Sequence, residues 1–237
     1  MNVEAKSTMH IMIGVPSARG VISSNTVSTI VALCRILSNM KVQYQFTCVS
    51  HADVTVARNT LAAAFLSGPY DVFIGIDDDV GVSEELLRKF VTLQYNFLGV
   101  YLPQRSLDLS RFEEAILAGH RDRTAQYVAA PCVPPHEPAD ALLVEGIRKV
   151  ERIGTGFYII RRSILEEMIK NGIVSKEVVR QANFTGVQYG FFNNIGSNEG
   201  YLSEDYSFCQ RVRQAGFDIH AYAGPGITHT GSMTFHS

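Results

Sequence analysis

Three consecutive aspartates, Asp77 to Asp79, directly follow the apolar run Val72–Ile76. Adjacent carboxylates repel one another, by roughly 4 kcal/mol per pair at ~4 Å and an effective dielectric constant of 20. A divalent cation would offset this repulsion, and both Mg²⁺ and Mn²⁺ prefer oxygen ligands. If the strand continues, Asp77 and Asp79 project to the same side. The motif therefore predicts a metal site, although a solvated aspartate-rich turn explains the three residues alone equally well.

A second acidic pair, Glu204 and Asp205, follows Ser203 at the start of a predicted helix over 204–215. The helix dipole stabilises ionised carboxylates at this position. Such a carboxylate can accept a proton from a substrate hydroxyl. Acidic residues are also common in the first turn of ordinary helices, so the pair alone does not distinguish catalysis from capping.

Three further residues have side chains suited to an anionic ligand or a metal. His229 lies in "PGITHTG", after a strand predicted over 217–222. A lone histidine is usually structural, but beside an aspartate-bound cation it would complete the ligand shell, and Mn²⁺ accepts nitrogen better than Mg²⁺. Arg58 and Arg105 follow predicted strand ends, where each could pair with phosphate or simply lie on the surface.

The composition is that of an ordinary globular domain of 237 residues, 46% hydrophobic, with a formal charge of −2. The charge is too small to attract nucleic acid, and no apolar run approaches the ~20 residues of a membrane span. Four cysteines without a C-x-x-C pair argue against a zinc ribbon or a disulfide framework. We expect a soluble cytoplasmic protein, with peripheral membrane attachment and oligomeric state left open, and Cys34, Cys48 and Cys209 in the core.

The first hundred residues alternate between strand and helix patterns, which predicts helices packed on a largely parallel sheet. In such a sheet the carboxyl ends of the strands share one edge, where ligands bind. The first helix, from Asn25, is expected to bury Val27, Ile30, Val31, Cys34 and Leu37, and the second strand to bury Tyr44, Phe46 and Cys48. The loops expected to meet at the ligand edge are 16–20, 50–53, 77–79 and 103–107.

The second half is less regular. Helical patterns cover 108–119 and 163–170, and glycines separate two or three strands between 141 and 162. The segment 131–138 contains four prolines and predicts a loop. The segment 191–203, rich in glycine and asparagine, predicts another loop, which could act as a lid over an acceptor. We find no linker and predict one domain.

Taken in order, these segments resemble the nucleotide-sugar glycosyltransferases of the GT-A fold over nearly the whole chain. The quoted pieces are "GVPSARG", "ARNTLAAAFL", "DVFIGIDDD" as the DxD motif, "LGVYLPQRSLD", "GTGFYIIRR", "SEDYSFCQRVRQAGFDI" and "ITHTG". The resemblance implies an α/β, Rossmann-like three-layer sandwich with a mainly parallel central sheet and a smaller antiparallel part on the acceptor side. Residues 1–105 would form the nucleotide-binding half and residues 106–237 the acceptor-binding and catalytic half.

The same resemblance implies an inverting transfer of a sugar from a UDP- or GDP-sugar to a hydroxyl of a glycan or another acceptor, with Mn²⁺ or Mg²⁺. Asp205 would be the general base, with Glu204 beside it, and Asp79 would bind the metal together with Asp77 and His229. The implied nucleotide-side residues are Pro16, Ser17, Arg19, Asp53, Arg58, Asp77 and Asp78, and the implied acceptor- or sugar-side residues are Arg105, Gly154, Thr155 and Gly156.

Two other functions remain open at this point. A sugar nucleotidyltransferase shares the α/β architecture and a metal, but "GVPSARGVISSN" lacks the lysine such enzymes carry in their phosphate loop. A non-catalytic nucleotide- or sugar-binding module on the same fold is the other alternative, because fold alone does not determine function.

Overall fold

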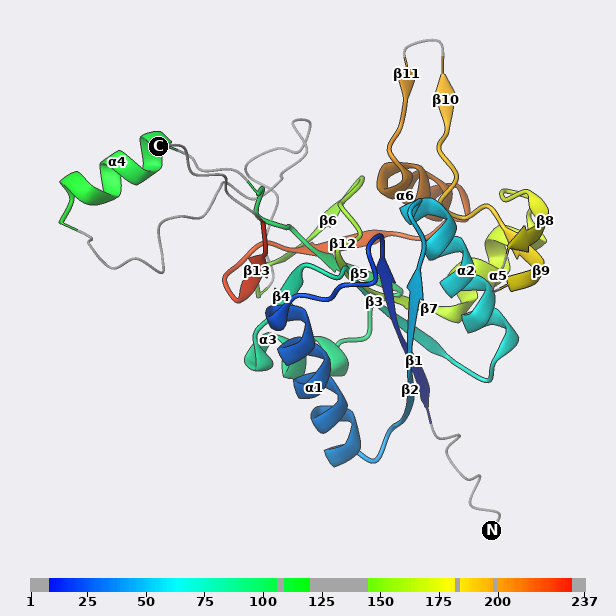
Figure 1. The fold of residues 1–237 in the computed structure, drawn as a ribbon, viewed down its shortest axis with the longest axis horizontal. Helices are drawn as coiled ribbons and strands as arrows, with labels where there is room; N and C mark the ends of the chain where they lie inside the picture. Colours follow the sequence, from blue (N-terminus) through cyan, green and yellow to red (C-terminus); the bar gives the residue numbers. More distant parts are fainter. Residues whose placement is uncertain (1–8, 106–108, 120–144, 182–183, 198–199, 232–237) are drawn as a thin grey trace.

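The structure, a computed structural model, describes residues 9–105, 109–119, 145–181, 184–197 and 200–231. Its centre is a seven-stranded sheet in the order β2-β1-β3-β7-β5-β12-β6 (Figure 1). The strands are β1 (His10–Ser17), β2 (Gln43–Ser50), β3 (Val72–Ile76), β5 (Phe97–Val100), β6 (Ile147–Val150), β7 (Phe157–Arg161) and β12 (Ile219–Tyr222).

The sheet is mainly parallel, as predicted. Strand β1 pairs in parallel with β2 and β3, and β5 pairs in parallel with β12. Strand β7 lies antiparallel between β3 and β5, and β6 is antiparallel to β12. Because β7 runs opposite to both of its neighbours, β3 and β5 point the same way, and five of the seven strands share one direction.

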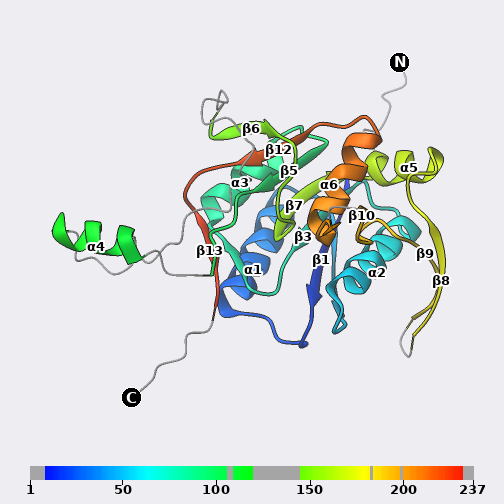
Figure 2. The same ribbon diagram turned by 90° about the horizontal axis from the view of Figure 1, so that it is seen from above.

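Helices cover both faces of the sheet and produce the predicted three-layer α/β architecture (Figure 2). Helices α1 (Ser24–Asn39) and α3 (Glu84–Thr92) lie on one face, and α2 (Val54–Ser67), α5 (Arg162–Lys170) and α6 (Glu204–Gln214) lie on the other. Each face has its own apolar core: Leu33, Leu37 and Phe90 belong to the first, and Phe65, Met168 and Phe208 to the second. Burial of these side chains is the main source of stability for both helix layers.

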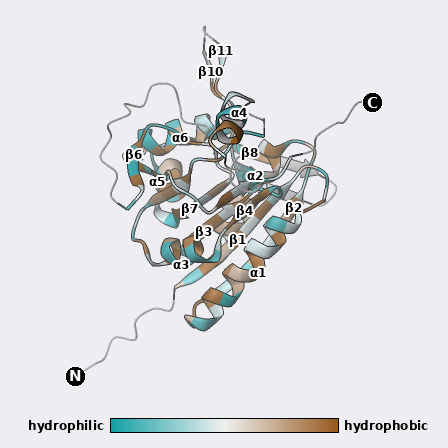
Figure 3. Ribbon diagram, turned by 90° about the vertical axis from the view of Figure 1, so that its left-hand side faces the viewer, coloured by the Kyte–Doolittle hydropathy of each residue, from teal (hydrophilic) through white to brown (hydrophobic). Residues whose placement is uncertain are grey.

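The chain adds a small two-stranded sheet that the sequence did not predict. Strand β4 (Val80–Val82) follows the three aspartates and pairs antiparallel with β13 (Ile227–His229), with His229 opposite Val80. The sequence predicted a strand over 217–222 and none after it, so β13 is an addition to the prediction. The buried strands β1, β3 and β4 are coloured as hydrophobic in Figure 3. Pairing of β13 with β4 brings His229 beside the aspartate turn.

The buried face of helix α1 agrees only in part with the predicted one, since Leu37 is buried and Ile30 and Cys34 are partly buried, but the two valines are not. Val27 and Val31 are 46% and 62% exposed, whereas Thr26 and Thr29 are buried. The Thr26 hydroxyl donates to the Val80 carbonyl at 2.8 Å, and the Val82 amide donates to the Thr29 hydroxyl at 2.8 Å. Buried backbone groups of β4 need hydrogen-bond partners on this side. Threonines therefore occupy positions that a hydrophobicity pattern assigns to solvent.

The predicted inward face of β2 was also wrong, because Tyr44, Phe46 and Cys48 are exposed. Strand β2 is the end strand of the sheet, so a period-two pattern there did not correspond to a buried face. Of the cysteines expected in the core, Cys209 is buried and Cys34 is half-buried.

The second half contains more strand than predicted. Hairpins β8–β9 (Lys176–Gln181, Phe184–Tyr189) and β10–β11 (Gly196–Ser197, Gly200–Tyr201) were not expected, and the second lies within the predicted loop 191–203. Helix α4 (Leu109–Leu117) agrees with the predicted helical pattern. The proline-rich loop 131–138 lies outside the described residues. None of the described helices has both the length and the apolarity to cross a membrane.

Candidate active site

The aspartate turn is anchored through its backbone to three separate parts of the chain. The Asp77 amide donates to the Gly156 carbonyl at 2.8 Å, just before β7. The Ser23 amide, before α1, donates to the Asp78 carbonyl at 2.7 Å, and the Thr230 amide, after β13, donates to the Asp79 carbonyl at 2.7 Å. These hydrogen bonds hold the turn at the carboxyl end of β3, on the predicted ligand edge.

The three aspartate side chains point to three different partners. Both Asp77 oxygens accept from Nη2 of Arg58, at 2.9 and 3.0 Å. One Asp78 oxygen accepts from the Ser17 hydroxyl at 2.7 Å, and Asp79 Oδ2 accepts from Arg105 Nη1 at 2.7 Å. Two arginines thus offset the mutual repulsion that the sequence predicted. The predicted convergence of the loops after β1, β3 and β5 is confirmed by these contacts.

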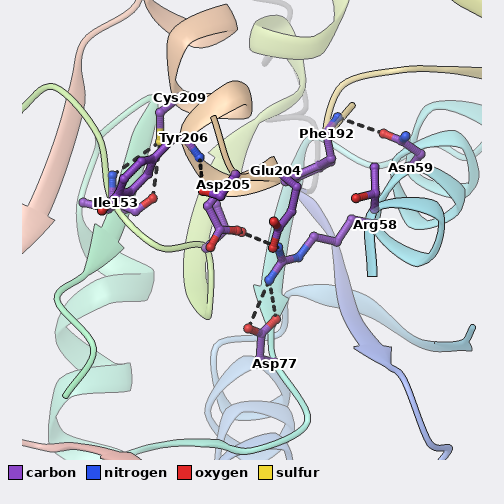
Figure 4. A network of polar contacts seen from close by, with 12 residues as sticks. Arg58, Asn59, Asp77, Ile153, Phe192, Glu204, Asp205, Tyr206 and Cys209 are labelled. Carbon is purple, nitrogen blue, oxygen red and sulfur yellow. Dashed lines mark hydrogen bonds and ion pairs between the residues drawn. The ribbon is translucent and has the colours of Figure 1, made fainter. Parts of the chain in front are cut away.

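Arg58 projects from α2 into the middle of the acidic residues (Figure 4). Its side chain is only 4% exposed, and its Nη1 contacts Glu204 at 2.9 Å and Asp205 at 2.5 Å, in addition to the Nη2 pair with Asp77. Its guanidinium also lies 5.7 Å from the ring centroid of Phe192. One buried cation therefore faces three carboxylates from two elements that are far apart in the sequence.

The electrostatics reflect this crowding. Burial lowers the pKa of Arg58, but Asp77 and Asp205 raise it by more, so it stays charged. Burial raises the pKa of Asp77 to about 6, since the attraction of Arg58 is opposed by Asp205 and Asp79. Nearby charges and burial perturb ionisation most strongly at functional sites.

Helix α6 presents Glu204 and Asp205 in its first turn, as predicted. The Ser203 side chain caps the helix by accepting from the Tyr206 amide, at 3.4 Å. Asp205 Oδ1, which accepts from Arg58, also accepts from the hydroxyl of Thr155, a fully buried residue. The acid pair is therefore held in place by side chains as well as by the helix.

The segment Gly154–Gly156 lies between Asp77 and Asp205. A Cβ atom added to Gly156 would lie 2.3 Å from Cδ1 of Leu102 and 3.4 Å from an Asp77 oxygen. A Cβ atom added to Gly154 would lie 3.7 Å from Oδ2 of Asp205. Gly156 therefore allows Leu102 to pack closely beside Asp77, whereas at Gly154 a methyl group would make only ordinary contacts beside Asp205, in the segment expected to line the sugar or acceptor site.

His229 and Asp79 form a second, smaller group. Nε2 of His229 lies 3.4 Å from Oδ1 of Asp79, and Nδ1 lies 2.8 Å from the Pro103 carbonyl. Burial lowers the pKa of His229, but the hydrogen bond to Asp79, the contact with the Pro103 carbonyl and the negative charge of Asp79 together raise it by more. Burial raises the pKa of Asp79, but His229 and Arg105 lower it by more.

The predicted three-ligand metal set is not assembled. Within the ranges that the structure describes, no group of three or more His, Cys, Asp or Glu side chains is arranged to hold a metal ion. The reason is that Asp77 turns toward Arg58, while Asp79 and His229 face each other. The candidate metal ligands are thus Asp79 and His229 alone.

The residues expected at the nucleoside are spread along the same edge. Pro16 and Ser17 are buried at the end of β1 rather than in a loop, whereas Arg19 is exposed beyond them. Asp53 is exposed and caps α2 by accepting from the Thr55 amide at 2.8 Å. Arg58, the remaining member on α2, is buried among carboxylates.

Sequence reasoning missed Asn59, the neighbour of Arg58. Its side chain accepts from the Phe192 amide at 2.9 Å and donates to the Asn193 side chain at 2.8 Å. Arg211 donates to the carbonyls of Phe191 and Asn193, at 3.0 and 2.6 Å. These bonds fasten the segment that precedes α6. The available signal was a second polar residue directly after Arg58, on a helix that is otherwise rich in alanine, valine and leucine.

A separate open groove of about 610 Å³ lies between α1, β4 and β13. Its lining includes Val31, Arg35 and Glu84, and the last two form an ion pair with each other. The carboxylates of Asp77, Asp79, Glu204 and Asp205 do not line this groove. We therefore place the candidate site around Arg58, where three of these carboxylates meet.

Comparison with known proteins gives no family model and no curated protein that matches the chain. Solved structures resemble its fold. The A197 protein from STIV is 18% identical, over 94% of this chain and 87% of that one, with a TM-score of 0.44. A mutant Drosophila beta-1,4-galactosyltransferase 7, in complex with manganese, UDP-Gal and xylobiose, is 14% identical over 94% of this chain and 71% of that one, with a TM-score of 0.45.

A glycosyltransferase involved in glycosylating the major capsid of PBCV-1 is 13% identical over 69% of this chain and 64% of that one, with a TM-score of 0.32. Two of these three structures are therefore glycosyltransferases by name. Because the TM-scores of these three structures are all below 0.5, we base the function on the geometry of the site.

Proposed function

We propose that the protein is a metal-dependent glycosyltransferase that moves a sugar from a nucleoside-diphosphate sugar to an acceptor hydroxyl. The observation that carries the proposal is the meeting of Asp77, Glu204 and Asp205 around Arg58 at the carboxyl edge of the parallel strands, with Asp79 beside them paired to Arg105. Residues 1–105 would supply the nucleotide side, and residues 106–237 the acceptor side and the base.

Asp79 and His229 would hold the divalent cation, Mn²⁺ or Mg²⁺. The contact of Nδ1 with the Pro103 carbonyl at 2.8 Å suits a metal-binding imidazole, because a proton on Nδ1 leaves the lone pair of Nε2 facing Asp79. Mg²⁺ commonly takes one or two carboxylates and completes its shell with phosphate and water. The ion, when bound, would stabilise the charge that develops on the leaving diphosphate.

Arg105 would bind the same phosphates. It is 55% exposed on its side chain and pairs with Asp79 through a single oxygen at 2.7 Å. An exposed ion pair of this kind contributes little stability, so the guanidinium can exchange a carboxylate for a phosphate at small cost. The nucleoside would be bordered by Arg19, which is exposed after β1, and by Asp53 at the start of α2.

Asp205 would act as the general base. The acceptor hydroxyl attacks the anomeric carbon, its proton passes to the carboxylate, and the bond from that carbon to the diphosphate oxygen breaks with the electron pair leaving on the diphosphate. One displacement from the opposite face inverts the anomeric carbon. Glu204 shares Arg58 with Asp205 and adds negative charge beside it.

A screen of nucleotides and metals tests the proposal. UDP or GDP should raise the melting temperature when Mn²⁺ or Mg²⁺ is present and should not do so in EDTA, because Asp79 and His229 bind the nucleotide through the ion. Asp79→Asn should remove this dependence. Asp205→Asn should keep binding and lose transfer.

The same screen separates the alternatives. Release of pyrophosphate from a nucleoside triphosphate and a sugar phosphate would indicate a sugar nucleotidyltransferase. Metal-dependent binding without turnover of any nucleotide sugar, with or without simple sugar acceptors, would indicate a binding module. A fully active Asp205→Asn variant would contradict the assignment of the base.

A further inference from the structure

Arg58 occupies a position that a nucleoside cannot reach without displacing buried ion pairs. The side chain is 4% exposed, and both of its terminal nitrogens contact carboxylates. Among the described residues, its Nε atom is buried without a hydrogen-bond partner. This environment differs from that of Arg105, which is half exposed and holds a single carboxylate.

The contacts of Asp205 are unequal between its two oxygens. Oδ1 accepts from Arg58 Nη1 at 2.5 Å and from the hydroxyl of Thr155. No described residue donates a hydrogen bond to Oδ2. Gly154 lies beside this oxygen, and a Cβ atom added to the glycine would be 3.7 Å from it. One oxygen is therefore held by two side chains, the other has no donor among the described residues, and the Asp205 side chain remains 23% exposed.

We propose that Arg58 is a positioning residue that holds Asp205 by Oδ1 and leaves Oδ2 to take the proton of the acceptor hydroxyl. This inference rests on the function proposed above and replaces the expected role of Arg58 at the nucleoside. The proton of the acceptor hydroxyl moves to Oδ2 of Asp205. At the same time the acceptor oxygen bonds to the anomeric carbon, and the diphosphate leaves with the electron pair of the broken bond.

The fork of the guanidinium explains why an arginine is needed. Nη2 binds Asp77, at the end of β3, while Nη1 binds Asp205, at the start of α6. A lysine is a single point charge and cannot span both carboxylates in a fixed geometry. Arg58 thus sets the distance between the strand that carries the donor-side aspartates and the helix that carries the base.

Kinetics of Arg58→Lys and Thr155→Val test the positioning role, using the nucleotide sugar that the metal-dependent screen turns over. We expect kcat to fall at least tenfold in Arg58→Lys and severalfold in Thr155→Val, with the donor KM and the UDP–Mn²⁺ thermal shift changed less than twofold. A nucleotide-binding role predicts the opposite pattern, a raised donor KM with kcat nearly unchanged, and that result would overturn the inference.

Arg162→Lys is the matched control. Arg162 also uses its guanidinium to donate hydrogen bonds inside the fold, but to the carbonyls of Phe65, Leu66, Gly68 and Tyr70, at the far end of α2. Its replacement should leave kcat and donor KM at the wild-type values. An equal loss of kcat in the control would mean that Arg58 acts only through general stability.

A double-mutant cycle tests the pairing without any substrate. In urea denaturation, Arg58→Met should strongly destabilise the fold, and adding Asp205→Asn should raise the folding equilibrium constant of that variant at least tenfold. Removing one partner from a buried pair leaves an uncompensated charge, which the second substitution removes. Additive effects would overturn the inference.

The two sets of measurements also separate the failure of the inference from that of the proposed function. If the wild-type protein binds no nucleotide with metal, the proposed function fails and the cycle still decides whether Arg58 holds Asp205. If nucleotide binding and transfer are present but the cycle is additive, the positioning role fails alone.

Discussion

Two glycines in one loop should respond oppositely to the same substitution. A methyl group at position 154 meets no atom closer than 3.7 Å, whereas at position 156 it lies 2.3 Å from Leu102 Cδ1 and 3.2 Å from Val80 Cγ2. Neither glycine has φ in the left-handed region, so backbone strain does not distinguish them. The loss of unfolded-state entropy, about 0.4–1 kcal/mol in favour of alanine, is common to both variants and cancels in their difference.

The contact with Leu102 sets the size of the difference. Overpacking typically costs about 1–3 kcal/mol, and the flexible end of a leucine can yield, which favours about 1–2 kcal/mol. In a chain of this size the two variants should therefore melt roughly 2–8 °C apart, with Gly154→Ala the more stable. Differential scanning calorimetry of both variants and the wild-type protein measures this directly.

The same pair tests the site. Because the methyl group of Gly154→Ala lies 3.7 Å from Asp205 Oδ2, this variant should melt at or above the wild-type temperature and still lose transfer activity. Equal melting temperatures for the two variants, or a more stable Gly156→Ala, would show that the packing around the loop differs from the one described. Full activity in Gly154→Ala would show that the acceptor does not approach that oxygen.

Three further predictions concern other parts of the structure. Thr26→Val should destabilise the fold by about 1–3 kcal/mol in urea denaturation, because a buried carbonyl of β4 loses its donor, and a loss below 0.5 kcal/mol would contradict this. Burial raises the pKa of Cys209 to about 12, so iodoacetamide at pH 8 should modify exposed Cys48 and leave Cys209 unmodified until the protein unfolds, as peptide mass spectrometry would report. Folding raises the pKa of His229, so without metal its pair with Asp79 stabilises the fold fully below the unfolded pKa of about 6.5. This stabilisation is lost as the pH rises through the folded pKa. His229→Gln should therefore lower the melting temperature more at pH 6 than at pH 9.

Much of the fold followed from pattern. The alternation of strands and helices in the first hundred residues and the helix predicted to start after Ser203 agree with the structure. These features depend on neighbours within a few residues, and local side-chain chemistry decides them. The parallel direction of the first strands followed from the same local patterns and the rules for crossover connections, whereas their order in the sheet was not predicted.

The misses share a physical cause. Thr26 and Thr29 are buried because β4 presents polar backbone groups to α1, and β4 exists because β13, about 145 residues further along the chain, pairs with it. The exposure of Phe46 follows from the place of β2 at the end of the sheet. A hydropathy pattern does not show which strand pairs with which, or whether a strand lies at the edge or in the centre of a sheet.

The candidate site shows the same division. The sequence by itself determined which residue types could do chemistry, because an aspartate run after a buried strand, an acid pair at a helix start and a histidine near the end of the chain are visible as patterns. Only the tertiary structure decided the partner of each carboxylate. Arg58 reaches Asp77 and Asp205 because the fold brings its position on α2 close to the end of β3 and the start of α6, and this leaves Asp79 to His229. The charge balance of a buried cluster depends on which groups meet in space, and that is set by long-range packing rather than by spacing along the chain.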